Sequence, residues 1–444
     1  MSEPKLSKQI QKGIDFSSLW TKEDWWTVWL GFLLMIAAGY GILSSPVMPK
    51  RWGREGAETI LASIPADIIT GIITTGLICL AVFAIAIVII KKEDFPKFLL
   101  AFPFIFILAI IAIVLGNYAP WRHYGFNDVI WALVVGLIIS NTIKTPEFLK
   151  GAVRTELYIK TGLVLLGASI LFNKMLALGA MGLGVAWLVT PIVLIFMYWF
   201  SQRVLKMHDN KGLAITIASA TSVCGVSAAI AAGTAAKAKK EEISLAISIT
   251  LIFTVIMMVG MPALVRLLGM DPIVGGAWLG GTIDSTGGVV AAGAMLGQDA
   301  MEVASVIKMV QNILIGVIAF GIAVFWVTFI EKKSAAEANV GPMEIWVRMP
   351  KFIIGFIAAS IIFSFFIPEA TVSSALKPVN GFRELFFTLA FVSIGLESNF
   401  GEMAKMVKGG KPLTLYVVGQ SFNLILTFIA AWIFFSGKFF TLPF

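Results

Sequence analysis

Charged residues are scarce in this chain of 444 residues, and histidine and cysteine are scarcer still. Only 14% of the residues are Asp, Glu, Lys or Arg, whereas 58% are hydrophobic. A water-soluble globular protein carries about 25% charged residues, so that class is excluded. The composition instead predicts an all-α polytopic membrane protein.

The two cysteines and two histidines exclude several kinds of site. Cys79 and Cys224 both lie in apolar segments, so no structural disulfide is expected. His123 and His208 lie in separate loops and show no metal-ligand spacing. Because the chain also lacks a Ser/His/Asp set and a phosphate-binding loop, we expect no enzymatic activity and no resident cofactor.

Long apolar runs alternate with charged or Pro/Gly-rich loops, which is typical of membrane-spanning helices. A polar segment at 1–24, expected in the cytoplasm, precedes the first run. Thirteen spans are predicted, at about 25–43, 68–90, 98–116, 126–143, 157–173, 181–200, 213–236, 244–268, 273–297, 303–330, 348–367, 382–400 and 413–435.

Lys and Arg are distributed unevenly between the two sets of loops. With the N-terminus inside, the cytoplasmic segments hold 21 of these residues and the outer segments hold 11. Because basic loops stay in the cytoplasm, we expect a bacterial inner-membrane protein with its N-terminus inside and its C-terminus outside. Lys237, Lys239 and Lys240 conflict with this orientation, which places them outside.

The span from Gly212 to Lys240 is poorly suited to face lipid. Of the 25 residues from Ala214 to Ala238, 19 are Ala, Gly, Ser, Thr or Cys, a composition typical of close packing among helices. Gly225 permits non-helical backbone, and neighbouring hydroxyls can satisfy the groups that a break would free. Two structures therefore remain open, a continuous close-packed helix and a helix broken near Cys224.

Short matches recur in the same order within the last ten spans. The segment 159–167 is similar to 307–316, and 216–227 is similar to 388–398. They predict two five-helix repeats that form a ten-helix core, and an odd number of spans makes the second repeat inverted. Inverted repeats with two broken crossing helices are typical of secondary transporters, so a second break is expected near Ile394–Gly395.

The predicted organisation therefore has four parts. Three peripheral helices at 25–125 follow the N-terminal segment 1–24. The first repeat covers 126–270 and the second covers 271–444.

Several motifs resemble those of the YeiH-type family of proposed sulfate exporters. They are Cys224–Gly–Val–Ser227, Val289–Val–Ala–Ala–Gly293 and the runs 162–167, 275–284 and 411–413, and the resemblance covers roughly 126–435. The family is similar to the cation/proton antiporter and anion transporter group, which implies ten core helices with two crossing unwound helices. The name implies sulfate as the cargo.

The chain departs from that family after Ile283. Asp284–Ser–Thr–Gly–Gly288 stands where the family carries a His and an acidic residue. A basic residue that follows Lys308 in the family is replaced by Gln311 or Asn312. The cargo can therefore differ from the one that the family name implies.

Lys160 and Lys308 occupy matching repeat positions inside apolar runs. A buried ammonium is costly and is by default a candidate for function, so the pair could hold an anion. The alternative is that each side chain reaches toward the headgroups along its stem. Asp284 could carry a proton, bind Na⁺ or pair with Lys308. Further candidate ligands are Asn141, Gln311, Asn312, Gln420 and Asn423, most of which are expected instead to join helices by hydrogen bonds.

The sequence predicts a secondary active transporter, by expectation an exporter, that moves a small anion such as sulfate, sulfite or an organosulfonate by alternating access. The expected partners are that anion and the lipid bilayer, with no nucleic acid, and a homodimer stays open. The predicted cargo ligands are Ser222, Cys224, Gly225, Ser227, Gly395, Ser398, Asn399, Lys160 and Lys308, and the predicted residues for coupling to Na⁺ or H⁺ are Asp284 and Glu397.

Three alternatives remain. One is a Na⁺- or H⁺-coupled cation exchanger that uses Asp284 and Glu397, and another is a carboxylate symporter of the same fold. An anion channel is the third, and it is less expected because one chain shows no repeated pore ring.

Overall fold

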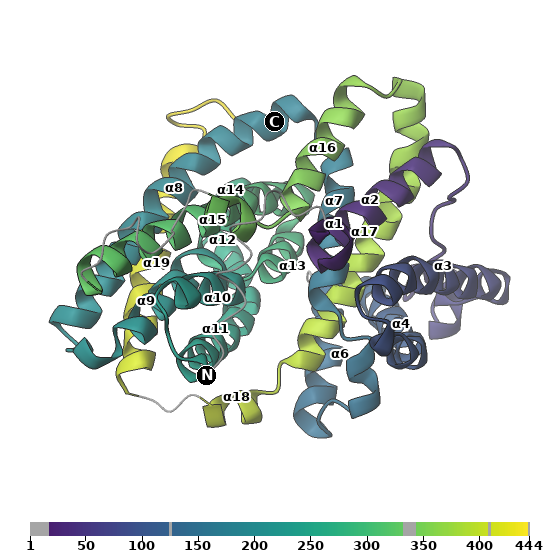
Figure 1. Cartoon of the computed structure of the whole chain (residues 1–444). Helices are drawn as coiled ribbons and strands as arrows, with labels where there is room; N and C mark the ends of the chain where they lie inside the picture. Colours follow the sequence, from purple (N-terminus) through teal and green to yellow (C-terminus); the bar gives the residue numbers. More distant parts are fainter. Residues whose placement is uncertain (1–16, 124–126, 332–342, 407–409, 443–444) are drawn as a thin grey trace.

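The computed structural model describes residues 17–123, 127–331, 343–406 and 410–442. The regular elements in these ranges are helices (Figure 1), which confirms the all-α class. By length and composition alone, eight helical segments could cross a membrane, and several shorter apolar helices accompany them. One of the eight, His208–Ala235, contains the turn described below. Most of the N-terminal segment, residues 1–16, lies outside the described residues.

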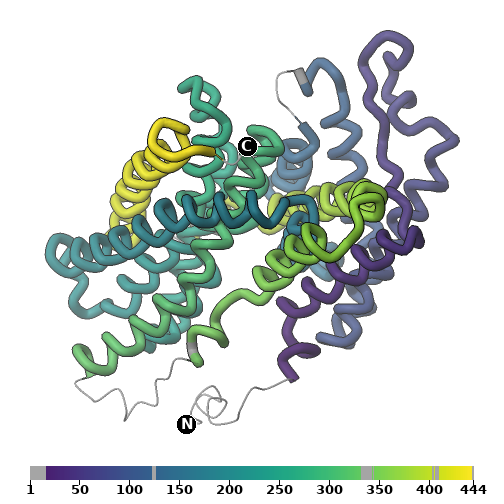
Figure 2. Tube along the Cα trace, turned by 90° about the horizontal axis from the view of Figure 1, so that it is seen from above, coloured from purple at the N-terminus to yellow at the C-terminus, as the bar shows by residue number. Residues whose placement is uncertain are grey.

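The helices form two groups that lie side by side in Figures 1 and 2. The frame group comprises α2 (Glu23–Gly39), α3 (Ala66–Ile90), α4 (Phe95–Gly116), α6 (Asp128–Thr142), α7 (Thr155–Ser169), α16 (Phe352–Phe365) and α17 (Glu369–Glu397). The hairpin group comprises α8 (Phe172–Arg203), α9 (Lys211–Ser219), the π-helical segment η5 (Ala220–Cys224), α10 (Gly225–Ala235), α11 (Lys240–Leu267), α12 (Pro272–Thr282), α13 (Thr286–Leu296), α14 (Gln298–Phe325) with its π-helical extension (Trp326–Ile330), and α19 (Lys411–Phe435). Short helices α1 (Ser18–Thr21), α5 (Ala119–His123), α15 (Met343–Arg348) and α18 (Phe400–Met406), and 3-10 turns at Ile60–Ser63, Lys92–Asp94, Glu147–Gly151 and His208–Asn210, complete the described elements.

The first interrupted helix turns back instead of crossing. A Cβ added at Gly212 would lie 3.2 Å from Cα of Ala238, and one at Gly233 would lie 3.1 Å from Oγ1 of Thr216. The two arms, α9 and α10, are therefore antiparallel, and Cys224 with extended backbone (φ −149°, ψ 90°) lies at the tip. We call α9, η5 and α10 hairpin 1. The break expected near Cys224–Gly225 is confirmed.

The second interrupted helix is α12–α13, which the sequence presented as one span. Ile283 and Ser285 have extended backbone, and the Ser285 hydroxyl caps α13 by accepting the Gly288 N–H at 3.3 Å. A Cβ at Gly275, near the start of α12, would lie 3.2 Å from Cδ1 of Leu296 at the end of α13. These two arms also run antiparallel, and we call them hairpin 2.

The break expected near Ile394–Gly395 is wrong, because α17 is continuous from Glu369 to Glu397. Gly395 has a packing role instead. A Cβ there would lie 2.5 Å from the Leu133 carbonyl oxygen and 2.7 Å from Cα of Gly136 on α6. A glycine can mark a close approach of two backbones as well as a break, and here it marks the approach.

Two turned-back hairpins change the positions of four basic residues relative to the membrane. Lys237, Lys239 and Lys240 return to the side on which α9 begins, and Arg266 moves to the opposite side. Counted in this way, the predicted cytoplasmic side holds 23 Lys and Arg residues and the outer side holds 9. The N-inside orientation stays a prediction, and its main conflict is removed.

Candidate functional site at the hairpin tips

The tips of the two hairpins meet inside the hairpin group. Cys224 Sγ, at the start of α10, lies 3.6 Å from Oγ1 of Thr286, the first residue of α13. The Asn312 amide on α14 donates to the same Thr286 oxygen at 3.0 Å. A Cβ at Gly225 would lie 2.8 Å from the Asp284 carbonyl oxygen, so glycine is needed for this approach. Two half-helices therefore begin within a few ångströms of each other.

The half-helices that end at the tips have their carbonyls capped by a buried lysine. The Lys308 ammonium donates to the carbonyl oxygens of Val223 and Ile283, the latter at 2.7 Å, and to Oε1 of Gln311 at 2.7 Å. An ammonium has three N–H donors, and these contacts use all three. A positive charge is thus placed at two helix C-terminal ends, where the helix dipoles stabilise it.

Uncharged side chains cap further carbonyls around both breaks. The Gln311 amide donates to the Ser222 carbonyl oxygen at 3.0 Å, and the Gln420 amide donates to that of Thr282 at 3.0 Å. Asn423 donates to the Thr221 carbonyl oxygen at 3.4 Å. The three amides thus join helices by hydrogen bonds, as the sequence predicted. The carbonyl ends of the broken helices are consequently shielded by donors.

The N-terminal ends of α10 and α13 instead face a cavity of about 310 Å³, here called the first cavity. Cys224, Ser227, Thr286 and Asn312 line it from the hairpin group. First-turn amides have no acceptor within their own helix, and each helix N-terminus carries about half a positive charge. Helix N-termini with nearby hydroxyls form a binding site for a small anion.

Charged side chains line the frame side of the first cavity. Lys160 on α7 lies 2.6 Å from Asp24 and 3.1 Å from Glu156, measured from its Nζ to the nearest carboxylate oxygen. Its charge is therefore largely compensated. Lys351, in the loop before α16, also lines the cavity; burial, with the nearby Lys22 ammonium, lowers its pKa to about 8.

Asp284 lies in the break between α12 and α13. Its Oδ2 accepts the hydroxyl of Tyr416 on α19, while its Oδ1 has no hydrogen-bond partner among the described residues. The Thr282 hydroxyl and Gln420 Oε1, which flank it, are also buried without a partner within the described chain. The unpartnered oxygens are thus one carboxylate oxygen of Asp284 itself and one oxygen each from Thr282 and Gln420.

The predicted site residues fall into three places, and one of them, Lys160, lines the first cavity from α7 as described above. Cys224, Gly225 and Ser227 lie at the hairpin 1 tip, and Ser222 directs its hydroxyl to the Ala218 carbonyl at 2.8 Å. Lys308 lies behind the tips and Asp284 at the hairpin 2 tip, as described above.

The other predicted residues lie in the frame group at the end of α17. The Ser398 hydroxyl donates to the Ile394 carbonyl, and the Asn399 amide donates to that of Ser140 on α6. Glu397 accepts the hydroxyl of Thr155 at 2.9 Å. The structure does not bring these residues, or Gly395, to the tips.

Sequence reasoning missed the start of α13 as part of the site. Because the sequence predicts 273–297 as one span, it assigns no role to Thr286. The signal was present in Ser285, a typical N-cap residue, followed by Gly287 and Gly288.

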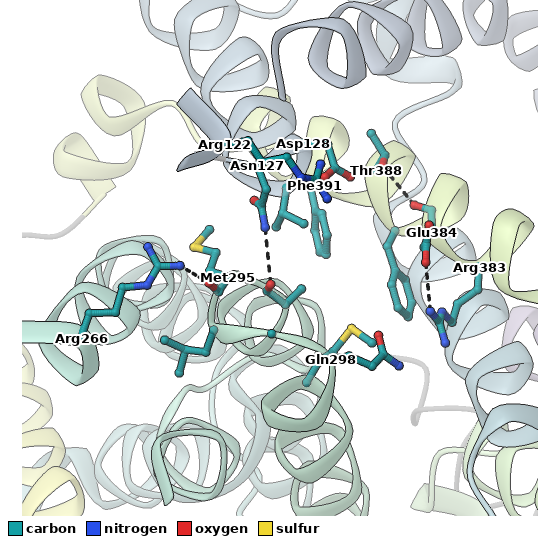
Figure 3. Close-up of a pocket in the computed structure, with 16 residues that line it drawn as sticks. Arg122, Asn127, Asp128, Arg266, Met295, Gln298, Arg383, Glu384, Thr388 and Phe391 are labelled. Atoms are coloured by element: carbon teal, nitrogen blue, oxygen red, sulfur yellow. Dashed lines mark hydrogen bonds and ion pairs between the residues drawn. The ribbon is translucent and has the colours of Figure 1, made fainter. Parts of the chain in front are cut away.

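A second cavity of about 410 Å³ lies at the opposite end of α13 (Figure 3). Met295 and Gln298 line it from the hairpin group, and Asp128, Arg383 and Phe391 line it from the frame group. The first cavity adjoins the N-terminus of α13 and the second adjoins its C-terminus. Since α13 has 11 residues, about 16 Å of helix separates them.

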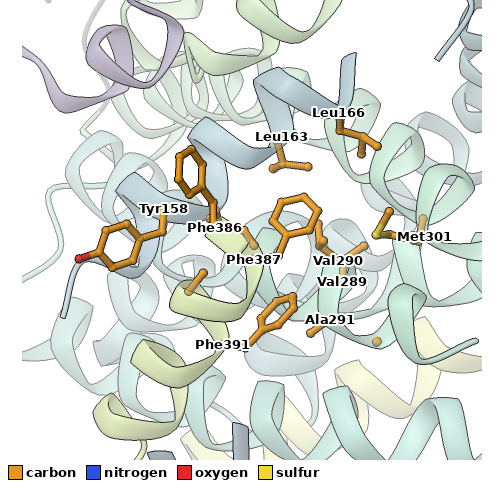
Figure 4. Packing of buried hydrophobic residues seen from close by; sticks show 14 of the residues in the cluster. Tyr158, Leu163, Leu166, Val289, Val290, Ala291, Met301, Phe386, Phe387 and Phe391 are labelled. Atoms are coloured by element: carbon orange, nitrogen blue, oxygen red, sulfur yellow. The ribbon is translucent and has the colours of Figure 1, made fainter. Parts of the chain in front are cut away.

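An apolar seam packs α13 against the frame group (Figure 4). Val289 and Val290 of α13 face Leu163 of α7 and Phe387 and Phe391 of α17, and all five side chains are buried in one cluster. The seam carries no hydrogen bonds between these side chains, since none has a polar atom. Packed apolar surfaces of this kind can separate two aqueous compartments and can slide.

The fold and the site together define a polytopic helical membrane protein in which two turned-back hairpins meet. The chain belongs to the UPF0324 membrane protein family. The family model described as "Conserved hypothetical protein 698" matches residues 100–416. The resemblance seen in the sequence is thus confirmed at the level of a membrane protein family.

Relatives in three bacteria illustrate the family. A UPF0324 membrane protein of Rhodopirellula baltica is 51% identical over 400 residues, covering 88% of this chain and 72% of the relative. One of Nitratidesulfovibrio vulgaris is 49% identical and covers 77% of this chain, which spans only 60% of that relative's length. One of Nitrosomonas europaea is 29% identical over 95% of this chain and 97% of its own. No solved structure matches the chain significantly.

Proposed function

We propose that the protein is a secondary transporter that binds a small anion between the N-termini of α10 and α13. The observation that carries this proposal is the asymmetry of the two breaks. Lys308, Gln311 and Gln420 cover the carbonyl ends, while the amide ends of both half-helices face the first cavity. The site therefore presents two partial positive charges to a ligand.

The donor set fits an oxyanion. Ser227 and Thr286 can donate hydroxyl hydrogen bonds, and the first-turn amides of both helices can donate several more. A cavity of about 310 Å³ holds sulfate, sulfite or a short organosulfonate, since small-ligand sites start near 300 Å³. Sulfate export, as the family resemblance implied, is one member of this class.

Alternating access would follow from a displacement of the hairpin group along the frame group. The two cavities lie at opposite ends of α13, and the apolar seam packs α13 against the frame group. A channel would need one continuous polar path, whereas this arrangement favours a carrier that exposes its site to one cavity at a time. With the predicted orientation, the first cavity faces the cytoplasm.

A specific observation favours coupling to Na⁺. Thr282 and Asp284 adjoin the hairpin 2 break, Gln420 donates to the Thr282 carbonyl, and each of the three residues has a buried oxygen without a partner among the described residues. Oxygen ligands with one carboxylate suit a hard monovalent cation. Na⁺ at this position would add a positive charge beside the anion site. The Asp284→Asn variant should then lose Na⁺-dependent stabilisation while its affinity for anion without Na⁺ is retained.

The experiment that tests the proposed function is flux into proteoliposomes. Purified protein is reconstituted, and uptake of labelled sulfate, sulfite, taurine and isethionate is followed with and without Na⁺ and pH gradients. We expect saturable uptake of at least one anion, driven by a gradient and reduced at least fivefold in Thr286→Val. Flux that does not saturate would indicate a channel, and no flux of any of these four compounds would contradict the proposal.

A further inference from the structure

A buried arginine in the second cavity is not used by the site at the hairpin tips. Arg383 lies 14 residues after the start of α17, about 21 Å along the helix axis. The sequence placed it at the outer end of a span that began near 382, but the helix begins at Glu369. An arginine inside a membrane helix is costly and by default functional.

The guanidinium of Arg383 has unused donors. Its side chain is 4% exposed, and its one ion pair joins Nη2 to the Glu384 carboxylate at 3.3 Å. Its Nε and Nη1 have no hydrogen-bond partner among the described residues. Because a guanidinium carries five N–H donors in a planar fork, Arg383 can still receive a bidentate oxyanion.

The other basic residues of the second cavity are differently engaged. Arg266 donates to the Met295 carbonyl, and Arg122 donates to Asn117 at 3.4 Å (Figure 3 shows Arg122, Arg266 and Arg383). Arg383 is thus the cation with free donors that are also buried. The carboxylates of Asp128 and Glu384 face the same cavity, and they limit how strongly it attracts an anion.

Lys160 provides a useful comparison, because it is a basic residue on a helix of the frame group and lines the first cavity. Two carboxylates, Asp24 and Glu156, compensate Lys160, whereas one carboxylate contacts Arg383. When the hairpin group moves toward the second cavity, the α13 N-terminus would leave the side of Lys160 and approach that of Arg383. The two basic residues would then face the cargo in turn.

We propose that Arg383 binds the transported oxyanion in the second cavity and forms a second station for the cargo on the side opposite the first cavity. The inference rests on the proposed function and deepens it, since it assigns the frame-side ligand of the opposite transport state. The ligand class is a sulfate, sulfonate or carboxylate, held by Nε and Nη1. This use leaves the ion pair of Arg383 with Glu384 in place.

Thiol labelling at the second cavity tests the assignment. Ala294, which lines that cavity, is changed to Cys in a Cys224→Ser background, and a membrane-impermeant maleimide is added to proteoliposomes. Sulfate or taurine should slow labelling of Ala294→Cys at least about fivefold. In the same protein with Arg383→Gln, the protection should be lost, and with Arg383→Lys it should be weaker, because an ammonium cannot form the bidentate contact.

Two controls separate the outcomes. Arg122 lines the same cavity, and Arg122→Gln should leave the protection of Ala294→Cys within about twofold. This control excludes an effect of losing any positive charge from the cavity. Cys224 labelling in Arg383→Gln should stay anion-protected, which shows that the variant is folded and that the hairpin site is intact. If the anion still protects Ala294→Cys in both Arg383→Gln and Arg383→Lys, this inference is wrong while the proposed function stands. The same holds if the anion protects Cys224 but never protects Ala294→Cys. Absence of protection at Cys224 in the unmodified protein would instead contradict the proposed function.

Discussion

Cys224, the N-cap of α10, and Thr286, the first residue of α13, have their Sγ and Oγ1 atoms 3.6 Å apart, although 62 positions separate them in sequence. This contact brings two helix N-termini together. The site therefore presents helix N-termini and not C-termini, because the carbonyl ends of the same breaks are covered by Lys308 and amide side chains.

Sidedness distinguishes a hairpin from a crossing helix. In a background without Cys79 and Cys224, we expect Asp209→Cys and Lys239→Cys to react with an impermeant maleimide from the same side of the membrane. Glu55→Cys, in the loop after α2, is the control and should react from the opposite side. Labelling of the first two positions from opposite sides would mean that residues 211–235 cross the bilayer.

Lys308 should contribute more to the stability of the fold than to anion affinity. Lys308→Met leaves the Val223 and Ile283 carbonyls without their donor, at a cost of about 1–3 kcal/mol each. We expect thermal unfolding several degrees lower, whereas Lys377→Met, at an exposed position, should leave it unchanged. If Lys308→Met unfolds normally and loses only anion affinity, the lysine is a direct cargo ligand, as the sequence suggested.

Gly395 tests the correction to the second break. Its missing Cβ lets α17 approach α6, so Gly395→Ala forces an atom to within 2.5 Å of the Leu133 carbonyl oxygen. Overpacking of this kind costs about 1–3 kcal/mol, and we expect a lower unfolding temperature with unchanged anion protection of Cys224. Gly260→Ala on α11, where a Cβ meets nothing within 4 Å, is the matched control. A stable Gly395→Ala variant with lost anion protection would return Gly395 to the binding site.

The all-α membrane class and the break near Cys224 could be predicted from the sequence, because both depend on local composition. Apolar runs fix membrane helices, and the small residues around Gly225 allow a tip. The sequence could not show that either interrupted helix turns back, because a hairpin and a crossing helix have the same apolar length. Short repeat matches then placed the second break at Gly395, where a glycine supports helix contact. The neighbours of Asp284 depended on the fold, since Tyr416 lies 132 positions away.

Anion affinity at the first cavity should depend on pH through Lys351. Burial and the nearby Lys22 lower the pKa of Lys351 to about 8, so the ammonium is mostly charged at pH 7 and mostly neutral at pH 9. Loss of one charge lining the cavity removes about 0.5–1 kcal/mol of attraction. We expect affinity to fall about two- to fivefold as pH rises through 8 in isothermal titration of a fully ionised sulfonate. In Lys351→Gln the pH dependence should be flat; an unchanged slope would assign it to another group.

The most direct test of the central claim is the rate at which a thiol reagent modifies Cys224. This thiol lines the first cavity beside Thr286, so an anion held at the starts of α10 and α13 covers it. We expect saturating sulfate or sulfonate to slow modification at least about tenfold, with half-protection near the anion concentration that half-saturates flux. Thr286→Val and Ser227→Ala should shift half-protection to higher anion concentration. Modification at the same rate with and without saturating cargo, in protein that transports it, would contradict binding between the hairpin tips.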